Sequence, residues 1–74
     1  MLTGRQIRAA RALLRWNSAE LADKAGVAPN TVVRAEAVDG VPPLYADSLD
    51  KIQTAFEAAG VEFLDGDGVR LNHS

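Results

Sequence analysis

Apolar residues near the start of the chain recur with the period of an amphipathic helix. Ile7, Ala10 and Leu14 follow one another at spacings of three and four residues, so they share one helical face. A threonine three positions before a glutamine stands ahead of them and matches the capping box with which many helices begin. This pattern predicts a helix over residues 4–15.

A second capping box follows directly in the sequence Asn-Ser-Ala-Glu at residues 17–20. It predicts a helix over residues 18–25, which Gly26 ends because glycine readily takes the left-handed conformation that follows a helix. Pro29 suits the first turn of a further helix over residues 29–37, since a residue there needs no amide donor. The chain is therefore expected to form two short helices that cross steeply around a tight turn, which is the helix-turn-helix arrangement.

The middle of the chain reads as a loop followed by a longer helix. Glycine and proline are concentrated in residues 38–45, which predicts a loop. Leu49, Ile52 and Phe56 then share one helical face and predict a helix over residues 46–59.

The last segment changes to a β pattern. Two β-prone segments, residues 61–64 and 69–71, flank the turn sequence Asp-Gly-Asp-Gly and predict a hairpin. The register that places Glu62 opposite Arg70 makes a favourable charge pair. Because a lone two-stranded hairpin is marginal in water, we expect it to pack on the preceding helix or to pair with a second chain. Residues 72–74 are expected to form a frayed tail.

Charge is divided unevenly along the chain. Residues 1–34 hold six basic and two acidic side chains, a net charge of +4, whereas residues 35–74 hold two basic and eight acidic ones, a net charge of −6. The total of −2 argues mildly against a nucleic-acid binder, but the asymmetry suggests that one face is built for an anion. Small domains often show uneven charge, so charge alone leaves both interpretations open.

No pattern in the sequence supports an enzyme, a metal site or a cofactor. The chain has no cysteine, and its only histidine is the penultimate residue. Residues 65–68 begin like a calcium-binding loop but lack the downstream glutamate, so a hairpin turn is favoured. No apolar run approaches the roughly 18 residues of a membrane span. Since no signal peptide is visible either, we expect a cytoplasmic protein without membrane contact.

Residues 17–36, NSAELADKAGVAPNTVVRAE, resemble the helix-turn-helix of the lambda-repressor-like, XRE family of DNA-binding domains. The likeness lies in a capping residue, Leu-Ala, Gly-Val before a small residue, Thr with an apolar neighbour, and a closing Glu. In helix order and spacing it extends over residues 3–59. It implies a mainly α fold, a compact four-helix lambda-repressor-like helix-turn-helix domain over residues 1–60. The β pattern described above adds a C-terminal β-hairpin and tail over residues 61–74. The hairpin lies outside the common family core.

The resemblance also implies which residues contact DNA. The helix over residues 29–37 would enter the major groove, where Asn30 suits adenine and Arg34 suits guanine. Pro29 and Val33 could offer only apolar contact, which suits a thymine methyl group. The positions that would hydrogen-bond phosphates are Asn17, Ser18 and Thr31.

One further pair carries a structural role in many family members. The resemblance implies a salt bridge between Arg11 and Glu36, which would join the first helix to the third. Direct DNA contact by either residue is the less favoured interpretation.

Three positions depart from the family pattern. Ser18 stands where glutamine is frequent, and Pro29 stands where a polar side chain is frequent. The loop after the third helix carries Asp39, where many relatives place basic residues. Fewer cations near the groove release fewer counterions, which predicts weaker DNA binding.

Two functions are therefore expected as alternatives. The first is a small transcriptional regulator, a repressor of the phage or mobile-element type, that binds a two-fold symmetric operator in double-stranded DNA as a homodimer. The second is a helix-turn-helix fold that acts as an antiactivator or antirepressor and binds another transcriptional regulator protein instead of DNA. The acidic pI, the apolar Pro29 and Val33, and the acidic Asp39 favour the second. In the first, further backbone contacts would come from Arg5, Arg8, Arg15 and Lys24.

Overall fold

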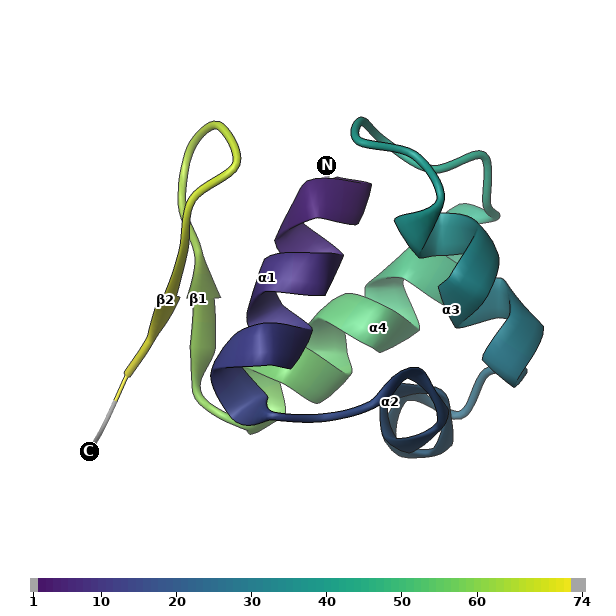
Figure 1. Ribbon diagram of the computed structural model, residues 1–74, viewed down its shortest axis with the longest axis horizontal. Helices are drawn as coiled ribbons and strands as arrows, with labels where there is room; N and C mark the ends of the chain where they lie inside the picture. Colours follow the sequence, from purple (N-terminus) through teal and green to yellow (C-terminus); the bar gives the residue numbers. More distant parts are fainter. Residues whose placement is uncertain (1, 73–74) are drawn as a thin grey trace.

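Four helices precede a two-stranded hairpin in the computed structural model, which describes residues 2–72 (Figure 1). The elements are helices α1 (Gly4–Leu14), α2 (Ser18–Ala25), α3 (Pro29–Glu36) and α4 (Ala46–Ala58), and strands β1 (Val61–Phe63) and β2 (Val69–Leu71). The predicted mainly α class with a C-terminal hairpin is confirmed. Each helix begins at the predicted residue and ends within one residue of the predicted end. The predicted tail is described only at Asn72, since residues 73–74 lie outside the described residues.

Local hydrogen bonds explain where α1 and α2 begin. The Thr3 hydroxyl accepts a hydrogen bond from the Gln6 amide at 3.2 Å, and Gln6 Oε1 accepts one from the Thr3 amide at 3.0 Å. Asn17 and Glu20 form the same reciprocal pair ahead of α2. Both predicted capping boxes are therefore confirmed. The turn after α2 is also as predicted, because Gly26 takes a φ of 72° there.

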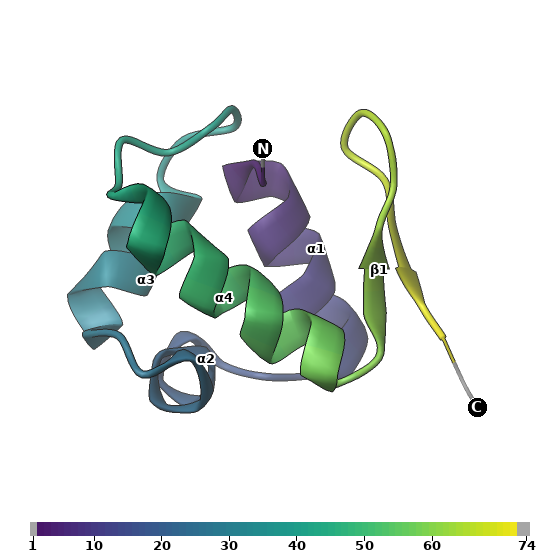
Figure 2. The ribbon, with the colours of Figure 1, turned by 180° about the vertical axis from the view of Figure 1, so that it is seen from behind.

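One core holds the elements together. In Figures 1 and 2, α1 and α4 lie between the hairpin on one side and α2 and α3 on the other. Phe56 of α4 is fully buried, with its ring centre 5.7 Å from that of Trp16 and 5.8 Å from that of Phe63. These aromatic contacts connect the two sides of the molecule. The buried apolar residues are Leu2, Ile7, Ala10, Leu21, Ala22, Val32, Ala35, Leu49, Ile52, Phe56 and Val61.

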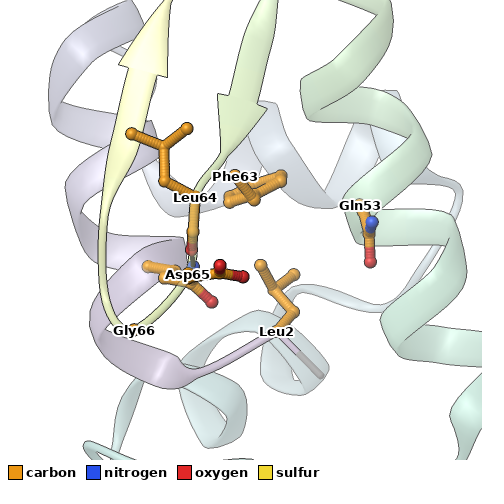
Figure 3. Close-up of a pocket in the computed structure, with 7 residues that line it drawn as sticks. Leu2, Gln53, Phe63, Leu64, Asp65 and Gly66 are labelled. Carbon is orange, nitrogen blue, oxygen red and sulfur yellow. Dashed lines mark hydrogen bonds between the residues drawn. The ribbon is translucent and has the colours of Figure 1, made fainter.

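The hairpin has the predicted register. Glu62 lies opposite Arg70, and Arg70 Nη2 is 2.6 Å from Glu62 Oε1. β1 packs along α4, as expected, and β2 packs along α1, which the sequence did not predict. Gln6 Nε2 donates hydrogen bonds to the carbonyl oxygens of Leu64 at 3.3 Å and Gly68 at 3.2 Å. The hairpin turn is therefore tied to α1, and a small cavity of about 240 Å³ lies between the turn, α1 and α4 (Figure 3).

Candidate nucleic-acid interface

The outer face of α3 is open to solvent. Val32 and Ala35 are fully buried, so the helix is oriented with these two side chains toward the core. The side of the helix that lies away from these two residues consequently faces solvent. The exposed side chains of α3 include Pro29, Asn30, Val33 and Arg34, which are the four positions predicted to read bases. The expectation that this segment presents Asn30 and Arg34 to the outside is confirmed.

The residues predicted to contact phosphates lie around the N-termini of α2 and α3. Asn17 is exposed, and its Oδ1 accepts a hydrogen bond from the Glu20 amide at 2.8 Å. The cap uses only the Oδ1 atom of this side chain, which leaves the Nδ2 group as a further donor. Ser18 and Thr31 are half-buried. α2 and α3 pack against each other.

The predicted ion pair between Arg11 and Glu36 is present. Arg11 Nε is 2.7 Å from Glu36 Oε2, and Arg11 Nη2 is 2.8 Å from Glu36 Oε1, so the contact is bidentate. Arg11 Nη1 also donates to the Trp16 carbonyl oxygen at 3.0 Å. The two side chains are only 26% and 12% exposed. The hydrogen bonds from Arg11 to Glu36, opposed by partial burial, raise the pKa of Arg11 above its usual value. This pair fixes the C-terminal end of α3 to α1.

Arg8 holds the same end of α3 by a different contact. Its Nη1 donates to the carbonyl oxygen of Glu36, the last residue of α3, and to that of Val38 at 3.4 Å. A cation beside free carbonyl groups at a helix C-terminus is stabilising. Sequence reasoning assigned Arg8 to the DNA backbone and missed this role. A signal was present, because Arg8 lies one helical turn before Arg11 and so faces the same neighbouring helix.

Two of the arginines that were expected to contact the DNA backbone, Arg5 and Arg8, form ion pairs with carboxylates of the same chain. Asp39 Oδ1 lies 2.6 Å from Arg8 Nη2 and 3.8 Å from Arg5 Nε. Arg5 Nη1 also lies 3.4 Å from Asp67 Oδ2 in the hairpin turn. The hydrogen bond from Arg8, helped by the charge of Arg5, holds the pKa of Asp39 below its usual value. Near the N-terminus of α1, the positive charge is therefore largely neutralised within the chain.

The other cations are less restrained. Lys24 Nζ lies 5.1 Å from the centre of the Trp16 ring, which is within range of a cation–π contact. Arg15 and Arg34 are exposed, and neither forms an ion pair with another residue in the described part of the chain. Arg34 is thus the cation that α3 offers most directly to an anionic partner.

A groove continues the exposed face of α3 toward the start of α4. It has a volume of about 470 Å³, and its lining includes Arg34 and Tyr45. Tyr45 is 86% exposed. Two further apolar residues are exposed outside the groove lining: Val33 of α3 at 55% and Val41 of the following loop at 50%. Sequence reasoning did not single out Tyr45. Its signal was an aromatic residue directly before a predicted helix, outside the apolar face of that helix.

Comparison with known proteins adds no family assignment. No protein-family model matches the chain, and no curated protein sequence matches it either. Among the described residues, no group of three or more His, Cys, Asp or Glu side chains is placed to hold a metal ion. Within residues 2–72, even the longest helix is too short and too polar to cross a bilayer.

Proposed function

We propose that the protein is a small DNA-binding transcriptional regulator, a repressor with a lambda-repressor-like helix-turn-helix fold, and that α3 reads the major groove of an operator. The observation that carries this proposal is the division of α3 into two faces. One face is buried through Val32 and Ala35, and the other presents Asn30 and Arg34 to solvent. An exposed helix of about two turns that is held firmly at one end suits insertion into a groove about 12 Å wide.

Each exposed residue of α3 has a distinct chemical role in this proposal. Arg34 donates two hydrogen bonds to guanine, and Asn30 pairs in a bidentate manner with adenine. Pro29 and Val33 contact thymine methyl groups. α2 lies across the DNA backbone, where its N-terminus and the Asn17 side chain approach a phosphate.

The proposed complex has two-fold symmetry, because one α3 helix can read only a short site. A single α3 contacts only a few base pairs, so a homodimer on a two-fold symmetric operator provides the required specificity. The two α3 helices would then lie about one DNA turn, roughly 34 Å, apart. Repression would result from steric occlusion of the polymerase.

The test begins with selection of bound duplexes from a randomised DNA pool, followed by titration of the enriched site. Arg34→Ala should weaken binding to this site by about 5- to 150-fold and relax specificity at one base pair. Arg70→Ala is the matched control, because Arg70 is exposed on the hairpin and pairs with Glu62. It should bind like the wild type. Absence of any enriched sequence at 50 mM salt, or an equal loss in both variants, would refute the proposal.

The salt dependence of binding is expected to be shallow. Within residues 2–34, the cations that form no ion pair with a carboxylate in the described part of the chain are Arg15, Lys24 and Arg34, and Lys24 lies over Trp16 and against α4. Three phosphate contacts correspond to a slope of about −3 in log K against log salt concentration. A slope near zero would indicate that the backbone is not bound.

A second candidate function is supported by apolar side chains that are exposed on α3 and in the segment between α3 and α4. Val33, Val41 and Tyr45 are three of the five large apolar side chains that are exposed in the described part of the chain. Such a surface suits a protein partner, and the neutralisation of Arg5 and Arg8 lowers the attraction for DNA. In this alternative the chain is an antiactivator or antirepressor that binds another transcriptional regulator. Tyr45→Ala would then abolish binding of the purified regulator, and no DNA would be selected.

A further inference from the structure

We infer that Arg5 and Arg8 form an oxyanion site that Asp39 occupies in the folded chain, and that a DNA backbone phosphate is the external ligand that competes with Asp39. The assignment to DNA rests on the proposed function, whereas the oxyanion site itself does not. Two guanidinium groups approach one carboxylate oxygen, at 2.6 Å from Arg8 Nη2 and 3.8 Å from Arg5 Nε. Convergent guanidinium groups bind carboxylates and phosphates by the same charge-assisted hydrogen bonds.

The Asp39 carboxylate is free to leave this site. Its side chain is 67% exposed, so it can rotate into water without breaking the core. Ion pairs with this degree of exposure are weak and are readily screened by salt. An external oxyanion can therefore compete with Asp39 for both arginines.

The loop that carries Asp39 does not depend on the carboxylate. The amide of Gly4 donates to the Gly40 carbonyl oxygen at 2.8 Å, and the amide of Arg5 donates to the Asp39 carbonyl oxygen at 3.4 Å. These main-chain bonds satisfy donors at the start of α1 and hold the loop against it. Gly4 makes this approach possible, because a Cβ atom there would lie 1.9 Å from the Val38 carbonyl oxygen. Loss of the carboxylate should leave the loop in place.

Arg8 stays in position when Asp39 leaves. Its Nη1 remains bonded to the carbonyl oxygens of Glu36 and Val38, so its Nη2 keeps its direction toward the site. Arg5 has a second partner in Asp67, which also accepts a hydrogen bond from the Thr3 hydroxyl at 3.0 Å. The site is thus partly preorganised. Its positive charge is partly neutralised by Asp39 and by Asp67.

The site lies beside the proposed reading helix, where a contact with the DNA backbone is expected. Arg8 touches the C-terminal end of α3, and the N-terminus of α1 lies on the same side of the molecule as the loop between α3 and α4 (Figure 1). A phosphate bound here would belong to the DNA backbone that borders the groove entered by α3. Asp39 then acts as an internal competitor that lowers affinity for DNA of any sequence.

The test compares Asp39→Asn with Asp50→Asn. Both variants remove one negative charge, but Asp50 is exposed on α4 beside Lys51 and Thr54 and lies outside the site. The first readout is the midpoint of thermal unfolding against sulfate concentration, at constant ionic strength maintained with chloride. At sulfate well above its Kd, Asp39→Asn should gain several degrees more than the wild type and Asp50→Asn. Arg5→Gln in the Asp39→Asn background should reduce this gain.

The second readout is the salt dependence of DNA binding. Asp39→Asn should steepen the slope of log K against log salt by about 1 for each phosphate newly contacted, and so by about 1 to 2. Asp50→Asn should leave the slope unchanged. Equal sulfate responses in the two variants would overturn the oxyanion site. A sulfate response without a steeper slope would overturn its assignment to DNA. Failure of the wild type to bind any DNA would refute the proposed function alone, because the sulfate measurement does not depend on it.

Discussion

Replacement of Arg11 by alanine should destabilise the protein more than the loss of any ordinary surface charge. The change removes the bidentate contact with Glu36 and the hydrogen bond to the Trp16 carbonyl oxygen. It also leaves the Glu36 carboxylate, which is 12% exposed, without its cation. A half-buried carboxylate without its cation is costly, because burial removes part of the water that would otherwise solvate its charge.

The magnitude follows from the degree of burial. Breaking a fully buried pair costs about 3–5 kcal/mol, whereas exposed pairs contribute about 0–1 kcal/mol. Arg11 is 26% exposed, so the pair lies between these limits but closer to the buried one. We expect Arg11→Ala to lower the free energy of unfolding by about 2–3 kcal/mol. For a domain of this size that corresponds to a fall of roughly 10–20 °C in Tm.

Urea unfolding at pH 7, followed by circular dichroism and by Trp16 fluorescence, measures this loss. Arg11→Lys keeps the charge but not the planar fork, so it should lose an intermediate amount. The double variant Arg11→Met, Glu36→Leu should recover most of the stability, because no unpaired charge is left. A loss below about 1 kcal/mol in Arg11→Ala would refute the reasoning, since the pair would then behave as an exposed one.

Three further outcomes follow from other contacts. Gly4→Ala should lower the free energy of unfolding by about 3 kcal/mol in urea, because its Cβ atom would lie 1.9 Å from the Val38 carbonyl oxygen. The loss is expected even though alanine favours helices more than glycine does. An unchanged urea midpoint would contradict the close approach. Deletion of residues 61–74 should lower the free energy of unfolding by more than about 3 kcal/mol, because the hairpin contributes to the core. Thermal unfolding measures this loss. Sedimentation shows whether the hairpin also joins two copies of the chain. The pKa values of Asp39 and Glu62 are lowered by hydrogen bonds from arginines. The stabilisation from these two ion pairs is therefore complete above the usual carboxylate pKa of about 4 and is lost as the pH falls toward the lowered values. Asp39→Asn should consequently show a weaker fall of Tm in acid than the wild type. An identical profile of Tm against pH would count against the pairing.

The helices were predictable from the sequence because local interactions define them. Apolar spacing, two capping boxes, a glycine after α2 and a proline at the start of α3 each act within one or two turns of the chain. The same spacing predicts which side of α3 is exposed, since Val32 and Ala35 can reach the core only if Asn30 and Arg34 point away. The hairpin register was predictable for the same reason, because the turn aligns Glu62 with Arg70.

The partners of the arginines were not predictable in this way. Arg5, Arg8 and Arg11 look alike along α1, yet Arg11 binds Glu36, Arg8 also caps α3, and Arg5 lies between two acidic turns. The position of Asp39 depends on how the loop after α3 returns to the start of α1, and that path is set by the packing of whole helices. The sequence alone therefore determined where the helices begin and end and which face of α3 is exposed, because short-range forces decide both. Only the tertiary structure decided which positive charges remain available to a partner, because ion pairs between distant segments form or fail according to a few ångströms of helix placement.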